Sequence, residues 1–355
     1  MQALEVAAHL SRRGYPLRLA CCAGSRLEQE ASARGVSVLP LPVTGYFHPF
    51  LLWRLSRFLR QSGVRIIHAQ HSRDLSLIVP AADLAGTSPL IILSKRMGSY
   101  VGKHDPLHRY TYARVRRVLA ISEVIRRNVG ETTTVPAARI ETLRDAIDTG
   151  EYSPGRGDRE RIRKEFGYSR RDMVVGFVGR FSPGKGHEDL LRAAGSLART
   201  HPRIRVLIVG EASTGEEEYA ERVRRSVTSA GLEGIVTFAG YRRDIPALMS
   251  AFDILAFPSH AESFGVVLIE AMAMELPVVS TNCDGVLDIV VDGKTGLFVP
   301  PRDAKRLAAA LARLADAPGL RRKLGRAGRR RVLRMFDRER QLDRLEEIYR
   351  ELAGE

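Results

Sequence analysis

The chain has 355 residues, 44% of them hydrophobic, and carries 56 Lys and Arg against 41 Asp and Glu. This length allows two domains of ordinary size, each with its own core. Three cysteines, two of them adjacent at Cys21 and Cys22, exclude a disulfide framework and favour a reducing compartment. No apolar run approaches the roughly 20 residues that a membrane span needs. A cytoplasmic protein is predicted, soluble or peripheral at the inner face of the cell membrane.

The formal net charge of +15 lies mostly in the first half, where residues 1–150 hold 21 Lys and Arg against 11 Asp and Glu. A basic face suits anionic lipid, nucleic acid or a phosphorylated substrate, while arginines that only solvate helices explain the charge equally well. Arg54, Arg57 and Arg60 on one predicted helix favour an anionic membrane surface. No aromatic-interleaved basic stripe and no zinc-finger spacing is visible, so no nucleic-acid partner is expected.

In chain order, the sequence opens with "MQALEVAAHLSRRGY", an amphipathic helix pattern unlike a signal peptide. Short β-rich runs then alternate with helical patterns, which is typical of parallel α/β layers. The predicted strands of the first half are 17–21, 36–39, 65–69, 90–93, 117–121 and 139–143. A Rossmann-like domain begins with a strand, so the first domain is expected to lack its first strand. We expect a form extended upstream by roughly 15 to 20 residues to be more stable and more active.

The stretch "DTGEYSPGRGDRE" breaks the alternation and is predicted to be a linker. The alternation then restarts, with predicted strands at 173–179, 205–210, 235–240, 253–258, 277–280 and 296–299. From Asp303 onward the pattern is helical and ends in the amphipathic stretch "RERQLDRLEEIYREL". The fold class is therefore α/β, with two Rossmann-like domains facing a cleft, and ligands are expected at the carboxyl ends of the strands.

The first distinctive loop is "GRFSPGKGHEDLL", which starts at Gly179 and carries Arg180 and Lys185 just before a predicted helix. Glycines let the backbone approach a ligand, the helix N-terminus carries partial positive charge, and two cations attract an anion. This combination suits a diphosphate, although an ordinary turn with a solvated Arg and Lys fits the loop about as well. The loop matches neither a Walker loop nor a dinucleotide G-x-G-x-x-G motif.

The second distinctive loop is "PSHAESFGVVLIEAMA", in which two glutamates stand eight positions apart. Glu262 is predicted in the loop and Glu270 about one turn inside a helix that starts near Gly265, so both can face one cleft. Free backbone N–H groups around Phe264 and Gly265 would bind phosphate oxygens. The carboxylates would accept hydrogen bonds from hydroxyls. These groups together suit a ligand with phosphate in the middle and polyols at both ends, which is a nucleotide sugar.

Residues 170–300 resemble the donor-binding domain of family 4 glycosyltransferases, which are retaining enzymes of the GT-B fold. The segment "GRFSPGKG" is similar to the G-R-x4-K-G loop of that family, and "ESFGVVLIE" is similar to its E-x7-E motif. The segments "FDILAFPS", "VVDGKTGLFVPP" and "LRDAIDTGEYSP" also resemble family blocks. The two-domain layout extends the resemblance over nearly the whole chain.

The resemblance implies an acceptor-side domain over 1–149, a nucleotide-sugar-binding domain over 150–336, and a C-terminal helix over 337–355 that packs on the first domain. Arg180 and Lys185 would hold the donor diphosphate, Glu262 would bind the donor sugar, and these three are the candidate catalytic residues. Glu270 would bind the ribose. The other candidate donor contacts are Gly179, Tyr241, Arg242, Ser263, Phe264 and Gly265. No metal or other cofactor is expected, because cations and a helix dipole replace it.

The sequence departs from the family pattern in two places. Many relatives carry a histidine after the fourth strand of the first domain, whereas this loop reads "LSKRMGSYVGKHD", and no catalytic histidine can be assigned. His104 and His108 lie downstream and are predicted to be surface or helix-capping residues. Asp288 in "DGVLD" stands where relatives have a glutamate. The candidate contacts to an anionic acceptor are Lys95, Arg96 and Lys103.

The sequence therefore predicts an enzyme, a retaining glycosyltransferase that moves a sugar from a nucleoside-diphosphate-sugar to a lipid-linked or lipopolysaccharide-like acceptor of the cell envelope. A nucleotide-sugar epimerase or a phosphorylase on the same two-domain plan is the alternative enzyme. A noncatalytic protein of anionic surfaces is the third hypothesis, and its binding would vanish with salt and ignore nucleotide sugars. The base, the sugar, the acceptor and the oligomeric state stay open.

Overall fold

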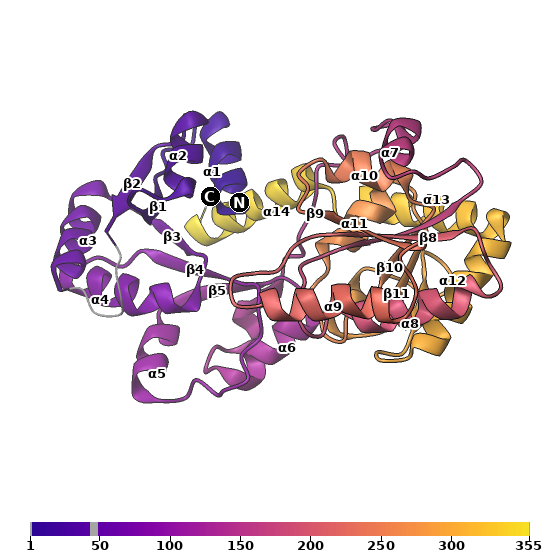
Figure 1. The fold of residues 1–355 in the computed structure, drawn as a ribbon. Helices are drawn as coiled ribbons and strands as arrows, with labels where there is room; N and C mark the ends of the chain where they lie inside the picture. Colours follow the sequence, from indigo (N-terminus) through magenta and orange to yellow (C-terminus); the bar gives the residue numbers. More distant parts are fainter. Residues whose placement is uncertain (1, 43–48, 355) are drawn as a thin grey trace. The chain divides into compact units, whose positions relative to one another are not determined.

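The computed structural model describes residues 2–42 and 49–354. The chain divides into two compact units (Figure 1): unit 1 comprises Met1–Ile121, Ile125–Leu143 and Leu342–Glu355, and unit 2 comprises Ser122–Val124 and Arg144–Gln341. Both contain parallel β-sheets with helices between successive strands, as the alternating pattern predicts. The predicted α/β class with two Rossmann-like halves is confirmed.

The described residues of unit 1 form six parallel strands in two separate sheets, in the orders β1-β2 and β3-β4-β5-β6. Each strand overlaps the run predicted for it. The strands are β1 (Leu19–Cys22), β2 (Val38–Leu41), β3 (Ile66–Ala69), β4 (Leu90–Lys95), β5 (Val115–Ala120) and β6 (Ile140–Thr142). The helices are α1 (Gln2–Arg12), α2 (Arg26–Ala33), α3 (Pro49–Ser62), α4 (Leu75–Ala85), α5 (Pro106–Ala113), α6 (Glu123–Thr132) and, from Leu342 on, α14 (Arg338–Ala353).

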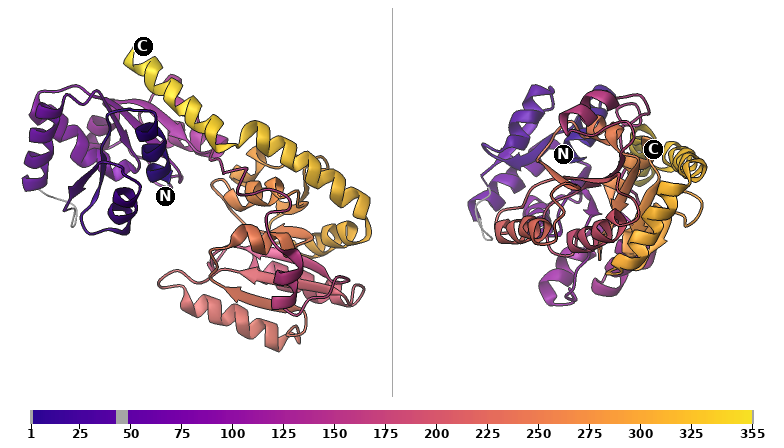
Figure 2. Two further views of the ribbon diagram at one scale, coloured as in Figure 1. Left: turned by 90° about the horizontal axis from the view of Figure 1, so that it is seen from above. Right: turned by 45° about the vertical axis from the view of Figure 1, so that its right-hand side comes forward.

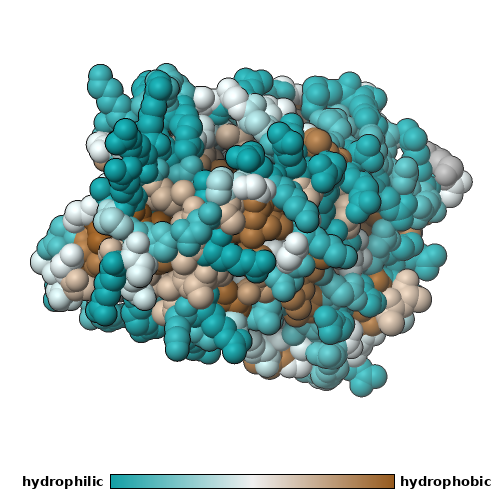
Figure 3. All heavy atoms as spheres, turned by 90° about the vertical axis from the view of Figure 1, so that its right-hand side faces the viewer, coloured by the Kyte–Doolittle hydropathy of each residue, from teal (hydrophilic) through white to brown (hydrophobic). Residues whose placement is uncertain are grey.

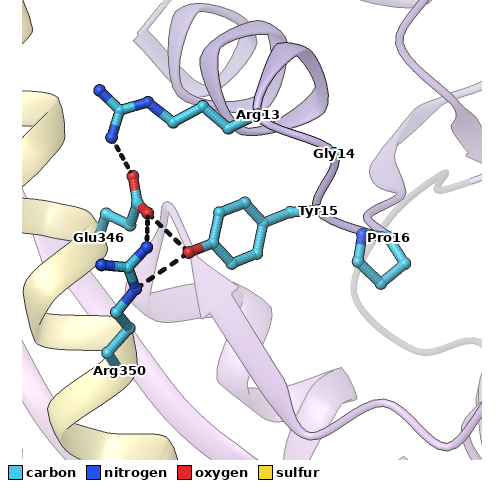
Figure 4. Close-up of a pocket in the computed structure, with 6 residues that line it drawn as sticks. All are labelled: Arg13, Gly14, Tyr15, Pro16, Glu346 and Arg350. Carbon is cyan, nitrogen blue, oxygen red and sulfur yellow. Dashed lines mark hydrogen bonds and ion pairs between the residues drawn. The ribbon is translucent and has the colours of Figure 1, made fainter. Parts of the chain in front are cut away.

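Helix α14 returns to unit 1 and completes one of its hydrophobic clusters. Leu345 and Ile348, one turn apart on α14, pack with Ile92 of β4 and Leu119 of β5. The polar face of α14 is tied to the end of α1, as Figure 4 shows: the buried carboxylate of Glu346 accepts a hydrogen bond from Tyr15 at 2.6 Å and pairs with Arg13 and Arg350. Apolar and charged contacts together hold the helix on unit 1.

Unit 2 contains one sheet of six parallel strands in the order β12-β11-β10-β7-β8-β9. The strands are β7 (Met173–Val178), β8 (Ile204–Val209), β9 (Val236–Gly240), β10 (Ile254–Phe257), β11 (Val278–Thr281) and β12 (Leu297–Val299). The helices are α7 (Arg159–Glu165), α8 (His187–Ala198), α9 (Glu217–Ser229), α10 (Ile245–Ala251), α11 (Val266–Ala273), α12 (Ala304–Asp316) and α13 (Pro318–Met335). Helices cover both faces of this sheet, with α8 between α9 and α12, and with α11 beside α13 (Figures 1 and 2).

The strands of unit 2 are continuous apolar runs because helices bury them from both sides. Val174, Val175 and Phe177 of β7 are at most 2% exposed, and β10 is buried throughout. Charged side chains are rare in this core, and Arg163 of α7 and Asp189 of α8 are two that are buried. Figure 3 shows one face of the molecule, on which hydrophilic residues cover most of the surface and hydrophobic residues form patches across the middle.

Candidate active site

The two distinctive loops leave neighbouring strands in the centre of the sheet of unit 2. The Gly179–Gly186 loop follows β7 and the Pro258–Gly265 loop follows β10, and these two strands pair directly. From β7 the chain moves first toward β8 and β9, and from β10 it moves toward β11 and β12. The strand order reverses between β7 and β10, and in open α/β sheets ligands bind at this point.

Each loop ends in a glycine that immediately precedes a helix. The backbone of this glycine has the left-handed conformation. Gly186 precedes α8 with φ +79°, and Gly265 precedes α11 with φ +101°. A glycine has no side chain that could cap the first N–H groups of its helix, and neither N-cap makes a side-chain hydrogen bond to them. A Cβ atom at Gly186 would lie 2.1 Å from the carbonyl oxygen of Pro258, so the two loops touch through their backbones.

A cavity of about 190 Å³ opens between the two loops. Lys185 and Glu262 lie in its wall and form an ion pair, with Nζ 2.6 Å from Oε2, and their side chains are 23% and 18% exposed. Arg180 also lines the cavity, and it donates to the hydroxyl of Ser213 at 3.0 Å. The full lining is Phe177, Val178, Gly179, Arg180, Lys185, Phe257, Ser259, Glu262, Gly265, Val266 and Val267. The structure therefore brings all three candidate catalytic residues to one cavity.

Glu270 lies on α11, outside the lining of that cavity. Its side chain is hydrogen-bonded to Tyr152, which the sequence assigned only to the linker. Burial raises the pKa of Glu270 to about 7, partly offset by the Tyr152 hydrogen bond. Burial, followed by the nearby Glu270 carboxylate, raises the pKa of Tyr152. Arg329 of α13 holds this corner together, because it donates to the carbonyl oxygens of both Tyr152 and Ala273.

The remaining donor candidates have other surroundings. Tyr241 is 59% exposed, and its backbone N–H donates to Glu211. Arg242 is paired with Asp244 and Glu165, and these carboxylates raise its pKa. Both residues lie outside the cavity lining, so a role near the base stays a prediction for them.

Two further candidates next to Glu262 have structural contacts. The Phe264 side chain is 2% exposed and packs edge-on against Phe336, with ring centroids 5.9 Å apart. The carbonyl oxygen of Ser263 accepts a hydrogen bond from Ser122 at 2.6 Å. These contacts hold the backbone that leads into α11. A ligand contact from Phe264 would therefore come from its backbone N–H, and one from Ser263 from its N–H or its hydroxyl group.

The basic acceptor candidates lie in unit 1, at the end of β4 and in the loop after it. Lys95 donates to Ser72 at 3.1 Å, and burial followed by the charge of Lys103 lowers the pKa of Lys95 to about 8. The Lys103 ammonium lies 6.0 Å from the centre of the Tyr112 ring. Arg96 follows Lys95 and is half-buried. Their role in acceptor binding stays a prediction.

Two departures from the family pattern have structural partners. His108 lies in the first turn of α5 and pairs with Asp105, which caps that helix; its side chain is 40% exposed, so it is a surface residue and Asp105 is the cap. Asp288 accepts hydrogen bonds from the backbone of Glu123 and from the side chain of Arg144, both at 3.0 Å. Asp288 thereby holds the start of α6 and the segment that follows β6.

One group of side chains in the described residues has the composition of a metal site. His9, Asp343 and Glu346 in unit 1 bring their ligand atoms within 4.8 Å of one another. Arg13 and Arg350 already neutralise the two carboxylates, since Arg13 contacts both and Arg350 contacts Glu346. This group is accounted for as the ion-pair cluster that fastens α14.

Sequence reasoning missed three polar residues that contact the site residues or their loops. Ser213 binds Arg180, and Tyr152 binds Glu270. His260 bonds to the Gly179–Gly186 loop through its backbone and to Asp189 through its ring. His260 and Ser213 belong to loops that follow strands at the binding edge of the sheet. That position is the signal that could have singled them out.

The sequence and the fold were compared with known proteins. A family model described as "Glycosyl transferases group 1" matches residues 158–331, and one described as "Glycosyltransferase Family 4" matches residues 1–151. A D-inositol 3-phosphate glycosyltransferase of Segniliparus rotundus is 32% identical over 75% of this chain and 56% of its own length. An alpha-D-kanosaminyltransferase of Streptomyces kanamyceticus is 27% identical over 90% of this chain and 89% of its own length.

Two solved structures have the same fold over nearly the whole chain. A glycosyltransferase of Rickettsia africae has a TM-score of 0.87 at 21% identity, covering 99% of this chain and 94% of its own. HepE of Anabaena in complex with UDP has a TM-score of 0.85 at 22% identity, covering 98% and 94%. The chain spans 56% and 64% of the lengths of two D-inositol 3-phosphate glycosyltransferases that it matches. The two family models, which between them match residues 1–151 and 158–331, show that this chain belongs to the family 4 glycosyltransferases.

Proposed function

We propose that the protein is a retaining glycosyltransferase that takes its sugar from a nucleoside-diphosphate-sugar. The observation that carries the proposal is the cavity lined by Arg180, Lys185, Glu262 and the N-terminus of α11, with α8 beginning two residues after Lys185. Cations and backbone N–H groups suit a diphosphate, and a carboxylate suits sugar hydroxyls. HepE of Anabaena, which shares the fold, has been solved with UDP-glucose, and this supports the same class of donor.

The ion pair between Lys185 and Glu262 indicates how the cavity would act. A diphosphate beside Lys185 competes for its ammonium group, and Glu262 then accepts a hydrogen bond from the donor sugar. As the bond from the anomeric carbon to the diphosphate oxygen breaks, the departing phosphate gains charge, which Lys185 and Arg180 stabilise. In a retaining transfer the acceptor oxygen bonds to the anomeric carbon on the face that the diphosphate leaves. The acceptor proton passes to the departing phosphate.

We also propose that this transfer needs no metal ion. Arg180, Lys185 and the N-termini of α8 and α11 would supply the positive charge that a metal supplies to a diphosphate. The measurement is turnover in excess EDTA against turnover with Mg²⁺ or Mn²⁺. Equal rates support the proposal, and a rate that depends on added metal contradicts it.

For the acceptor we propose a lipid-linked or lipopolysaccharide-like molecule of the cell envelope. The candidate contacts Lys95, Arg96 and Lys103 are basic, so the acceptor group that they bind is expected to be anionic. A phosphorylated polyol is the second candidate, because several relatives are named D-inositol 3-phosphate glycosyltransferases. Labelled donor offered with a membrane lipid extract and with inositol phosphate in separate reactions distinguishes the two acceptors.

An anionic membrane surface is a further proposed partner, and α3 of unit 1 favours it. Phe50 and Trp53 are 66% and 51% exposed, and the guanidinium of Arg57 lies 5.7 Å from the Trp53 ring centre. Aromatic side chains beside arginines suit the interface of an anionic bilayer. Arg60 is not part of this surface, because it donates to the last carbonyl groups of α4. Among the described residues, no helix is long and apolar enough to cross a bilayer.

The membrane proposal has a direct test. Sedimentation with phosphatidylglycerol vesicles and with phosphatidylcholine vesicles measures it, using the wild type, Trp53→Ala and Arg57→Glu. Binding to the anionic vesicles alone, reduced in both variants, supports the surface on α3. Equal binding to both kinds of vesicle, or no binding, contradicts it.

The decisive experiment on donor use is a thermal-shift panel of nucleoside diphosphates and their sugars. A ligand at 100 times its dissociation constant should add about 2.7 kcal/mol of stability. Product analysis with labelled donor then separates the enzyme classes, because an epimerase converts the donor without an acceptor. A panel without any stabilising nucleotide would remove the proposal.

A further inference from the structure

His260 lies in the loop after β10, directly after Ser259 in the cavity wall, and it contacts the Gly-rich loop in two ways. Its backbone N–H donates to the carbonyl oxygen of Gly184 at 2.7 Å. Its ring Nε2 lies 2.6 Å from a carboxylate oxygen of Asp189. One residue of the second loop therefore bonds to the first loop through both its backbone and its side chain.

The partner of the His260 ring is a buried acid. The Asp189 side chain is 3% exposed and belongs to the first turn of α8, whereas the His260 side chain is 18% exposed. The other charged group on this carboxylate is Arg192, whose side chain is 64% exposed. A buried carboxylate that loses a close partner keeps its cost of desolvation. The pair with His260 is thus a strong contact between segments 71 positions apart in the chain.

The two contacts of His260 bracket Lys185, since Gly184 precedes it and Asp189 follows it by four positions. Glu262 comes two residues after His260 on the other loop. We propose that His260 is a positioning residue, which clamps the two loops together and thereby sets the separation of Lys185 and Glu262 for the donor. This inference rests on the proposed use of a nucleoside-diphosphate-sugar.

The clamp matters most when donor is bound. Phosphate and sugar groups would compete for Lys185 and Glu262, so the direct ion pair between the loops is expected to weaken. The bonds of His260 to Gly184 and Asp189 involve neither of these side chains and persist. Binding groups need to be held to within about 0.5 Å of their productive positions, and supporting contacts of this kind hold them.

The test uses two isosteric substitutions of His260. The amide nitrogen of glutamine can reach the place of Nε2, which contacts Asp189, while that of asparagine reaches only the place of Nδ1. We expect His260→Ala and His260→Asn to lower kcat/KM for the donor and to weaken binding of UDP, each tenfold or more. His260→Gln should stay within about threefold of the wild type. If His260 were needed only for stability, its substitution would change the melting temperature, and the Gln and Asn variants would not differ in kcat/KM or in UDP binding.

Two further variants separate positioning from folding. His260→Ala combined with Asp189→Asn leaves no buried charge without a partner, so we expect it to melt close to the wild type and still to bind UDP at least tenfold more weakly. His201→Ala is the matched control, because His201 pairs with Asp316 at 3.1 Å just beyond the other end of α8. We expect its UDP affinity to equal that of the wild type.

The outcomes distinguish this inference from the proposed function. If the wild type binds UDP, Lys185→Ala loses that binding, and His260→Asn binds and turns over like the wild type, the clamp is wrong and the function stands. If the Gln and Asn variants lose activity equally, the contact with Asp189 is not what matters. If the wild type binds no nucleoside diphosphate and no nucleotide sugar, the proposed function and the clamp both fail.

Discussion

Lys185 and Glu262 neutralise each other in the cavity that Arg180 also lines. We expect Lys185→Ala and Arg180→Ala each to lower turnover tenfold or more with the fold intact. A charge-assisted hydrogen bond contributes about 1.5 to 3 kcal/mol, and more as the departing diphosphate gains charge. Initial rates with labelled donor and melting temperatures measure this. Arg170→Ala is the control, at a side chain that is 82% exposed in the same unit. Unchanged turnover in both cavity variants would remove the diphosphate assignment.

The two glutamates of the second loop and its helix have different surroundings, and they are expected to have separable roles. Glu262 is in the cavity wall, while Glu270 lies deeper on α11 beside Tyr152. Glu270→Ala should weaken binding of the bare nucleoside diphosphate, because that ligand contains the ribose. Glu262→Ala should weaken only the sugar-bearing donor. Titration calorimetry with both ligands measures the difference, and equal losses of bare nucleotide binding in both variants would contradict this division.

The pH dependence of Glu270 provides a second test of its role. Its folded-state pKa of about 7 lies above the ordinary 4.5. Between these values the folded protein holds a proton that the unfolded chain releases, so stability from this group falls as pH rises through that interval. Ribose hydroxyls donate best to the charged form. We therefore expect UDP affinity to rise about tenfold from pH 6 to pH 8, following ionisation of the carboxyl.

Glu270→Gln is the control for this pH dependence. The titration of the nucleotide phosphate is common to both proteins, so the difference between their profiles isolates the carboxyl. The variant should also lose the decline in stability between pH 5 and pH 8. Identical binding profiles for the wild type and Glu270→Gln would show that the carboxyl does not contact the ligand.

Among the elements, the strands were predictable because burial from both faces demands continuous apolar runs. The run "MVVGFV" of β7 and the run "LIIL" in β4 are examples, and each strand in residues 2–42 and 49–354 overlaps its predicted position. The start of α7 at Arg159 was missed, because it lies inside the Gly- and Pro-containing stretch that reads as a linker. Its cap is Asp158, a signal that Gly155 and Gly157 just before it obscured.

Side-chain partners between distant segments were not predictable in this way. Arg242 pairs with Glu165, which is 77 positions earlier, and no periodicity links two such places. The same holds for His260 and Asp189. The sequence placed Lys185 and Glu262 in one site because the loops after two parallel strands were expected at the same edge of a sheet. It did not predict their ion pair. Topology brings loops together, whereas the pairings within them depend on packing detail.

The start of α8 depends on a glycine at position 186. Its φ of +79° disfavours any other residue, and a Cβ there would overlap the carbonyl oxygen of Pro258. Gly184 has a similar φ of +84° but open space around its Cβ position. We expect Gly184→Ala to cost about 1 kcal/mol of unfolding free energy from strain alone. Gly186→Ala should cost more and also weaken UDP binding.

Urea denaturation and UDP titration of the two glycine variants measure this difference. Gly234→Ala is the control, at a residue with open space around its Cβ position and no positive φ. If Gly186→Ala binds UDP as tightly as Gly184→Ala does, the close approach of the two loops is not needed for the donor.

Considered together, the two units share one chain that crosses between them more than once, and α14 makes the final crossing. Ile348 of α14 is fully buried against residues of unit 1. We expect Ile348→Ala to lower the stability of unit 1 by about 2 to 5 kcal/mol, because it leaves a cavity in a packed cluster. Hydrogen exchange measures the effect in each unit separately. The amides of β4 and β5 report on unit 1, and the amides of the unit 2 strands report on unit 2.

We expect Ile348→Ala to accelerate hydrogen exchange in unit 1 more than in unit 2. Leu333→Ala serves as the control, at a residue of α13 that is 39% exposed. Equal acceleration of exchange in the strands of both units would show that α14 belongs to one cooperative fold, against the expectation.

The return of α14 also sets an order of events during synthesis. A chain leaves the ribosome from its N-terminus, at about 5 to 20 residues per second. The strands β4 and β5 emerge early, but Leu345 and Ile348, which cover Ile92 and Leu119, follow only after unit 2 has been made. Those roughly 200 intervening residues take about 10 to 40 s. Unit 2 can therefore close before unit 1, and during that interval Ile92 and Leu119 lack their α14 cover, a transient apolar surface of the kind that chaperones bind.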